Sequence, residues 1–248
     1  MIKLLKYDLR RNANLLLGVT VVLIIGELVL LWSRAALEIK LVLTVFFFIA
    51  AAVIFTISSL KVFDYNIKSV SRRLLPVHAF SYVWASLLYG LINTLVLTLI
   101  GIGTAFYFFA KIDTSLIGDI FRIPVPVMAG IVVEYILVLV YGYFTIYVTI
   151  ALARSITRKG VFWVGLIIFL IITNVTGWLE NLMFNRDSSQ IFSLVTFHAE
   201  VSNGVLSHDM ANSSMNLNSI GTLIFEVLLC AVYLLVIKWC VEKRIEAK

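Results

Sequence analysis

Long apolar runs alternate with short polar segments along the whole chain. Each run exceeds a dozen residues, which suits a membrane-crossing helix and not a short barrel strand. The runs predict six spans, at residues 14–33, 41–60, 82–110, 124–153, 161–180 and 219–240. The first run follows basic residues, as a signal peptide would, but no small-residue cleavage site comes after it, so we expect it to be retained. The pattern predicts an all-α integral membrane protein with six transmembrane helices.

Composition and charge agree with this pattern. Hydrophobic residues make up 61% of the 248 residues and charged residues 14%, whereas a soluble domain is about half apolar and about a quarter charged. Fifteen of the 20 Lys and Arg residues lie in the segments 1–13, 61–81, 154–160 and 238–248. Because basic residues gather on the cytoplasmic side, both termini are predicted to be cytoplasmic.

The N-terminal residues 1–13 form a predicted amphipathic helix that precedes the transmembrane domain, residues 14–240, and the cytoplasmic tail, residues 241–248. Apolar residues share one stripe of this helix: Ile2, Leu5 and Leu9. Basic residues lie beside them: Lys3, Lys6, Arg10 and Arg11. Such a helix lies in the membrane interface with its basic side on anionic headgroups. The simpler alternative is a positively charged flank.

The longest polar interruption in the first half of the chain is residues 61–81. A short amphipathic helix is predicted at about residues 65–75, because three apolar residues there follow helical spacing. These residues are Ile67, Val70 and Leu74. Basic residues accompany them: Lys68, Arg72 and Arg73. Pro76 ends the helix. A helix of this kind either anchors the chain at the membrane surface or is the binding site for a soluble partner.

Three carboxyl groups fall at similar depth in the outer halves of their predicted spans: Glu27, Glu134 and Glu226. An ionised carboxylate near the bilayer centre costs about 2.5–3.5 kcal/mol on insertion scales. The three glutamates either form a polar ring that lines a cavity and meets a cationic substrate, or are three separate groups, each hydrogen-bonded to a neighbouring helix.

Two amide side chains also lie within spans, Asn93 and Asn174. Both are expected to form hydrogen bonds between helices.

The long predicted outer loop, residues 181–218, contains an apolar island at 191–197 that is too short to cross the bilayer. We expect a re-entrant, interfacial or capping helix there. The loop also holds four residues of metal-binding type: His198, Glu200, His208 and Asp209. Their spacing matches no zinc signature, so no metal site is predicted.

Motifs for chemistry are missing from the sequence. There is no G-x-x-x-x-G-K-[ST] loop for ATP and no G-x-S-x-G nucleophile elbow. The chain is therefore not expected to be an enzyme.

The two cysteines are expected to be free thiols. Cys230 and Cys240 lie ten residues apart on one predicted helix, about 15 Å along its axis, which is too far for a disulfide.

Two segments carry a resemblance to a known family: KLLKYDLRRN before the first span, and SVSRRLLPVHAFSYVWASLL between the second and third spans. With six spans and both ends inside, the chain resembles the permease subunits of ABC-2-type ABC transporters, small six-span bacterial exporter subunits of type V. The resemblance implies that residues 1–13 are an elbow helix and residues 65–75 a coupling helix. The chain departs from larger members because it lacks a big domain between spans one and two.

The resemblance also implies partners and cargo. Two copies of a separate ATPase subunit would hold ATP and Mg²⁺, with no cofactor on this chain, and a second or homologous permease would complete the transporter in the bacterial cytoplasmic membrane. Arg72 and Arg73 would make polar contacts to the ATPase, with Ile67, Val70 and Leu74 packing into its groove or under the span ends. The arginines would otherwise bind headgroups. The cargo would be an amphipathic or hydrophobic peptide, antimicrobial or lipid-like drug.

Two alternatives come from other classes of protein. One is a stand-alone receptor or immunity protein that binds a toxic peptide without transport. The other is an intramembrane enzyme, which would need catalytic residues at a shared depth that the spans do not supply.

Overall fold

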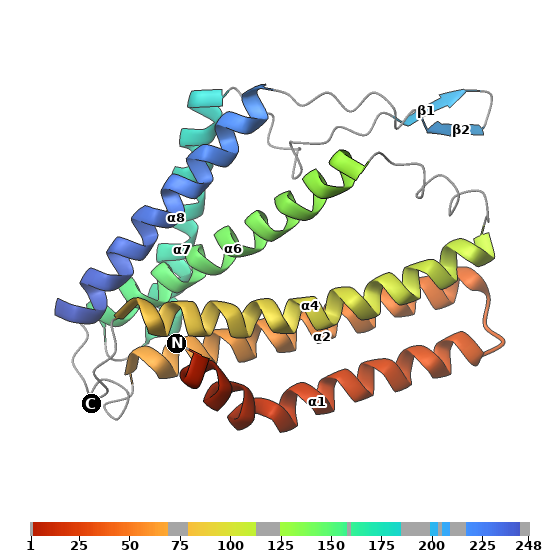
Figure 1. Ribbon diagram of the computed structural model, residues 1–248, viewed down its shortest axis with the longest axis horizontal. Coiled ribbons are helices and arrows are strands. Elements are labelled where there is room, and N and C mark those ends of the chain that lie inside the picture. The colour runs from red at the N-terminus through yellow and green to blue at the C-terminus, as the bar shows by residue number, and fades with distance from the viewer. Residues whose placement is uncertain are drawn as a thin grey trace. The chain divides into compact units, whose positions relative to one another are not determined.

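The computed structural model describes residues 2–68, 79–112, 125–157, 160–184, 199–202, 205–208 and 217–243. These residues form six long helices (Figure 1): α1 (Ile2–Trp32), α2 (Leu37–Lys68), α4 (Ala79–Ile112), α6 (Val125–Ile156), α7 (Val161–Phe184) and α8 (Leu217–Lys243). All six are long and apolar enough to cross a membrane. The prediction of an all-helical membrane protein is confirmed in this respect: its described residues form six helices that could each span a membrane.

The outer surface of the helices fits the same conclusion. Large apolar side chains are widely exposed, among them Trp32 at 91%, Phe162 at 73% and Trp163 at 68%. In water, apolar exposure on this scale would drive aggregation, whereas lipid tails solvate it. The helices themselves satisfy their backbone groups internally, as the hydrocarbon core requires.

Two helices extend further than the apolar runs alone predict. Residues 1–13 and the first span were expected as separate helices, but α1 is continuous from Ile2. Figure 1 shows its first turns set at an angle to the rest. The Asn12 side chain donates to the Asp8 carbonyl at 3.0 Å, a bond that competes with the helix ladder. α2 continues past the predicted end at residue 60 to Lys68.

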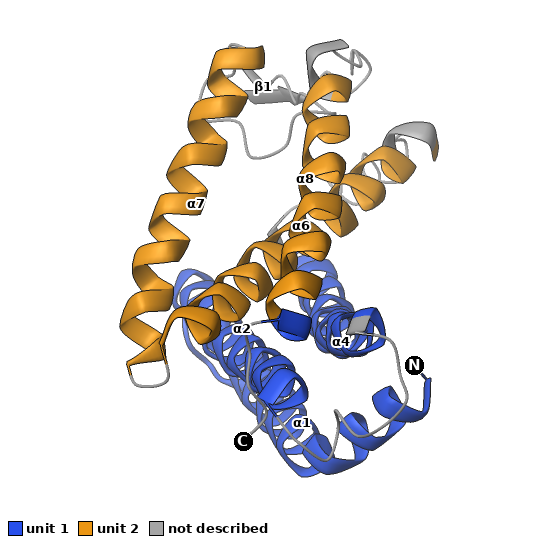
Figure 2. Ribbon diagram, turned by 90° about the vertical axis from the view of Figure 1, so that its left-hand side faces the viewer, with its two compact units in different colours: residues 1–118, 241–248 blue, residues 119–240 orange. Residues whose placement is uncertain are grey.

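The chain divides into two compact units (Figure 2), residues 1–118 with 241–248, and residues 119–240. In the first unit α1 packs on both α2 and α4, and α2 packs on α4. The most deeply buried side chains of α2 include Phe63 and Ile67, and those of α4 include Tyr89. Gly26 brings α1 close to α2, because a Cβ there would lie 3.4 Å from the Phe47 ring.

In the second unit α6 packs on α7. α8 joins them through aromatic contacts, with the rings of Tyr141 and Tyr233 6.2 Å apart and those of Phe184 and Phe225 6.1 Å apart. Because Phe184 ends α7 and Phe225 lies near the start of α8, these helices run antiparallel.

A short hairpin stands between α7 and α8 in sequence. Strand β1 (Ala199–Ser202) pairs antiparallel with β2 (Val205–His208), with Ala199 opposite His208. This hairpin was not predicted from the sequence. The apolar island 191–197, for which a helix was expected, lies outside the described residues.

The contact between α7 and α8 makes a specific prediction at Gly221. A Cβ at this position would lie 2.6 Å from Phe184 Cε1, so the ring must move. We expect Gly221→Ala to lower the free energy of unfolding by about 1–3 kcal/mol. Reversible unfolding in mixed detergent micelles measures this. Adding Phe184→Leu, which makes room for the methyl group, should restore most of the loss.

Gly177 of α7 is the matched control, because a Cβ there would meet nothing within 4 Å. Gly177→Ala should leave stability unchanged or raise it by up to about 1 kcal/mol, since glycine weakens helix interiors. Equal effects of the two alanines would contradict the packing described for Gly221.

Candidate functional site: a buried polar cluster at the ends of three helices

Three helices of the first unit meet where α1 begins, α2 ends and α4 begins. Leu4 of α1 forms a buried apolar cluster with Tyr82 and Ala85 of α4. The basic side chains Lys3, Lys6 and Arg10 are exposed, as the amphipathic pattern predicts. The apolar stripe differs from the prediction, because Ile2 is 78% exposed and Leu4 is buried in its place. The N-terminal turns of α1 therefore rest on protein as well as facing outward.

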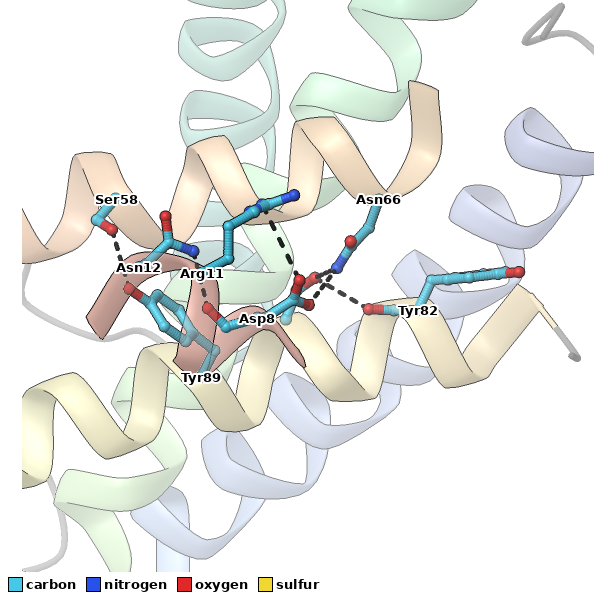
Figure 3. A network of polar contacts seen from close by, with 8 residues as sticks. Asp8, Arg11, Asn12, Ser58, Asn66, Tyr82 and Tyr89 are labelled. Atoms are coloured by element: carbon cyan, nitrogen blue, oxygen red, sulfur yellow. Dashed lines mark hydrogen bonds and ion pairs between the residues drawn. The ribbon is translucent and has the colours of Figure 1, made fainter. Parts of the chain in front are cut away.

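Asp8 is the centre of this junction (Figure 3). Its side chain is fully buried, and its Oδ2 accepts a hydrogen bond from Asn66 Nδ2 of α2 at 3.1 Å. The same amide nitrogen donates to Ser86 Oγ of α4 at 2.9 Å. Ser86 Oγ in turn donates to the Tyr82 carbonyl at 3.0 Å. One amide group thus bridges all three helices, and we call Asp8, Asn66 and Ser86 the junction cluster.

Arg11 supplies positive charge beside the buried carboxylate. Its Nη2 lies 4.0 Å from Asp8 Oδ1, one helical turn along α1. Its guanidinium carbon lies 4.0 Å from the centre of the Tyr65 ring of α2, a cation–π contact. Headgroup binding by Arg11 stays a prediction, since 29% of its side chain is exposed. In the structure Arg11 also contacts Tyr65 and so helps to hold α1 against α2.

The polar contacts continue along the interface between α2 and α4. Ser58 Oγ and Tyr89 OH are 3.0 Å apart, and Asn93 Nδ2 donates to Ser59 Oγ at 3.2 Å. Between membrane helices such bonds contribute about 0.6 kcal/mol on average and up to about 1.7. They also fix the register of the two helices. The predicted interhelical bond of Asn93 is confirmed.

Asn174 does not behave as predicted. Its Nδ2 donates to the Leu170 carbonyl of its own helix at 2.7 Å. An amide side chain at the surface of a helix can satisfy its donor on the preceding turn, so a polar residue in a span is not by itself a sign of an interhelical bond.

The predicted coupling segment, residues 65–75, overlaps the last turn of α2 and includes Asn66 of the junction cluster. Ile67 is 1% exposed in the last turn of α2, and Lys68, the last residue of that helix, is exposed. Residues 69–78 lie outside the described residues, and with them Val70, Arg72, Arg73 and Leu74. The described ends of this connection are Lys68 and Ala79, and the junction cluster holds the helices that carry both.

The three intramembrane glutamates belong to different units. Glu27, in the first unit, is 3% exposed, and its Oε2 accepts a hydrogen bond from Thr44 Oγ1 of α2 at 2.9 Å. Glu27 Oε1 has no hydrogen-bond partner among the described residues. Glu134 is 2% exposed in α6, and Glu226 is partly exposed in α8. The Glu27–Thr44 pair matches the alternative of separately bonded carboxyls, whereas the polar ring stays a prediction.

Groups for metal or redox chemistry do not gather in the part of the chain that the structure describes. No three His, Cys, Asp or Glu side chains there could hold a metal ion together. The thiols of Cys230 and Cys240 are free, as the sequence analysis predicted. The polar groups described here hold helices together, and the junction cluster is the candidate functional site.

The junction cluster makes Asp8 important for stability. Asp8→Ala would leave the buried Asn66 amide without its α1 acceptor, so we expect the free energy of unfolding to fall by about 1–3 kcal/mol. Asp8→Asn keeps an acceptor oxygen and should lose less. Reversible unfolding in mixed detergent micelles measures both variants.

Lys6→Ala, on the exposed side of the same helix, is the control and should change stability by no more than about 0.5 kcal/mol. If Asp8→Ala and Lys6→Ala had equal effects, the buried carboxylate would not anchor α1.

Comparisons with protein-family models, curated proteins and solved structures give no match for this chain.

Proposed function

We propose that this chain is the permease subunit of an ATP-driven ABC-2-type exporter, which moves an amphipathic or hydrophobic substrate out of the cell. A separate ATPase subunit, in two copies, would bind ATP and Mg²⁺. A second permease copy or a homologous permease would complete the path through the bacterial cytoplasmic membrane. The observation that carries the proposal is the junction cluster, which ties together the helices on both sides of the basic connection after α2.

Force transmission explains why this cluster matters. An ATPase that pulls on residues 69–78 acts first on Lys68 and Ala79, the ends of that connection. Asn66 lies two residues before the end of α2, and Ser86 lies two turns into α4. Since both bond within one buried cluster with Asp8, a displacement of the connection moves α1, α2 and α4 together. Coupling between sites needs a connected element of this kind with two arrangements.

Charge supports a partner on this side of the protein. The connection carries Arg72 and Arg73, and exposed Lys3, Lys6 and Arg10 lie on the first turns of α1. Positive charge on the predicted cytoplasmic side suits both anionic headgroups and an acidic groove. We propose that the basic residues of α1 bind the headgroups and that the arginine pair binds the ATPase groove.

The test is recovery of the ATPase with the tagged, full-length chain from native membranes. We expect a soluble ATPase with a P-loop to co-purify with the unaltered protein. Arg72→Glu combined with Arg73→Glu should lower its recovery on the order of tenfold, because reversed charges repel an acidic groove. Quantitative mass spectrometry measures the ratio of ATPase to permease.

Lys3→Glu combined with Lys6→Glu makes the same change of charge on α1 and is the matched control. It should leave ATPase recovery near that of the unaltered protein. Absence of any P-loop ATPase from the unaltered preparation would instead favour a stand-alone peptide-binding membrane protein. Unchanged recovery with both arginines reversed would remove the coupling role of residues 65–75.

A further inference from the structure

Glu27 is a carboxyl group buried at the contact between α1 and α2. It lies five residues before the end of α1, and its partner Thr44 lies seven residues after the start of α2. The pair is therefore about 8–11 Å inside the ends of these helices. Leu23 and Glu27 are the buried side chains of α1 after residue 13. The carboxyl group thus lies within the predicted spans and faces protein.

The carboxyl group has fewer hydrogen bonds than its ionised form would need. Its Oε2 accepts a hydrogen bond from Thr44 Oγ1 at 2.9 Å. Only 3% of Glu27 is exposed, and its buried Oε1 has no hydrogen-bond partner among the described residues. An ionised carboxylate offers about four acceptor positions. Most of these positions would be unfilled here.

Positive charge does not balance this carboxyl group. Lys40 lies one helical turn before Thr44 on α2, but its ammonium group donates to the Leu31 carbonyl of α1 at 3.0 Å. Within the described part of the chain, Glu27 forms no ion pair and no hydrogen bond besides the one with Thr44. The other charged side chains at this end of the first unit are exposed: Arg34, Glu38 and Lys111.

The cost of burial favours a neutral group at this position. Burying a neutral polar group without a hydrogen bond costs about 1–3 kcal/mol in proteins, whereas an isolated ionised carboxylate costs far more and takes up a proton instead. A metal cation could also balance the charge, but Ca²⁺ needs about six to eight oxygen ligands. No three His, Cys, Asp or Glu side chains gather among the described residues. A proton needs no further ligand.

We propose that Glu27 is a proton-binding site and is a neutral carboxylic acid at neutral pH. The proton is on Oε1, and Oε2 is the carbonyl oxygen that accepts the hydrogen bond from Thr44. The bound proton lets the carboxyl group lie between two membrane helices without a counter-ion. Carboxyl groups within spans are found in the proton relays of pumps and transporters. The proposal concerns the contact between α1 and α2 alone and does not depend on the proposed function.

The test is infrared difference spectroscopy of the purified full-length chain in lipid nanodiscs at neutral pH, without any ATPase. Carboxylic acids and carboxylates have separate stretching bands, so subtracting the spectrum of Glu27→Gln isolates this one group. We expect Glu27→Gln to lose the C=O band of one carboxylic acid per chain and no carboxylate band. Glu38→Gln, which changes an exposed carboxyl group of α2, is the matched control and should lose carboxylate bands.

Loss of carboxylate bands from Glu27→Gln would overturn the proposal, because the group would then be ionised and balanced by a cation or by Lys40. This result would leave the ATPase recovery test unaffected. Gel filtration checks that each variant is folded.

A second variant tests the geometry without altering the carboxyl group. Thr44→Val removes the donor to Oε2 and keeps the shape of the side chain, so the acid C=O band of Glu27 should remain and shift to higher frequency. Thr20→Val is the control, because Thr20 Oγ1 donates to the Leu16 carbonyl of its own helix at 2.8 Å. It should leave the band in place. An identical acid band in Thr44→Val and the unaltered chain would refute the site.

Discussion

A carboxylate buried within a protein needs hydrogen-bond partners, and Asp8 has one on a neighbouring helix. Its side chain is fully buried and accepts a hydrogen bond from Asn66, which also donates to Ser86. Separating these helices would remove the partners of buried polar groups, at a cost of about 1–3 kcal/mol each. The basic N-terminal turns of α1 are thereby fixed to the ends of α2 and α4.

The two units are held together by different kinds of contact. In the first unit polar side chains join α2 and α4, through Ser58 with Tyr89, and Asn93 with Ser59. In the second unit aromatic rings join the helices, with Tyr141 stacked on Tyr233 and Phe184 against Phe225. Directional hydrogen bonds fix the register of α2 and α4, which suits helices that transmit force under the proposed function.

The spans could be predicted because long apolar runs have few alternatives to a membrane helix. The junction cluster could not, because its bonds join residues far apart in the sequence: Asn66 is 58 positions from Asp8 and 20 from Ser86. Polar residues near span ends are usually solvated, so their sequence does not indicate such bonds. A signal was nevertheless present: Asp8 is the first acidic residue of the chain and stands among four basic ones. The hairpin had a signal too, because Asn203-Gly204 between Val201 and Val205 is a strong turn sequence.

A double-mutant cycle on Asp8 and Asn66 tests most directly whether the junction cluster binds α1 to α2. Unfolding free energies are measured for Asp8→Ala, Asn66→Ala and the double variant in mixed detergent micelles. If the two side chains stabilise each other, the double variant loses less than the two single losses combined, with a coupling energy of about 0.5–3 kcal/mol. Losses that add to within about 0.3 kcal/mol would show that the side chains act independently, and would contradict the account.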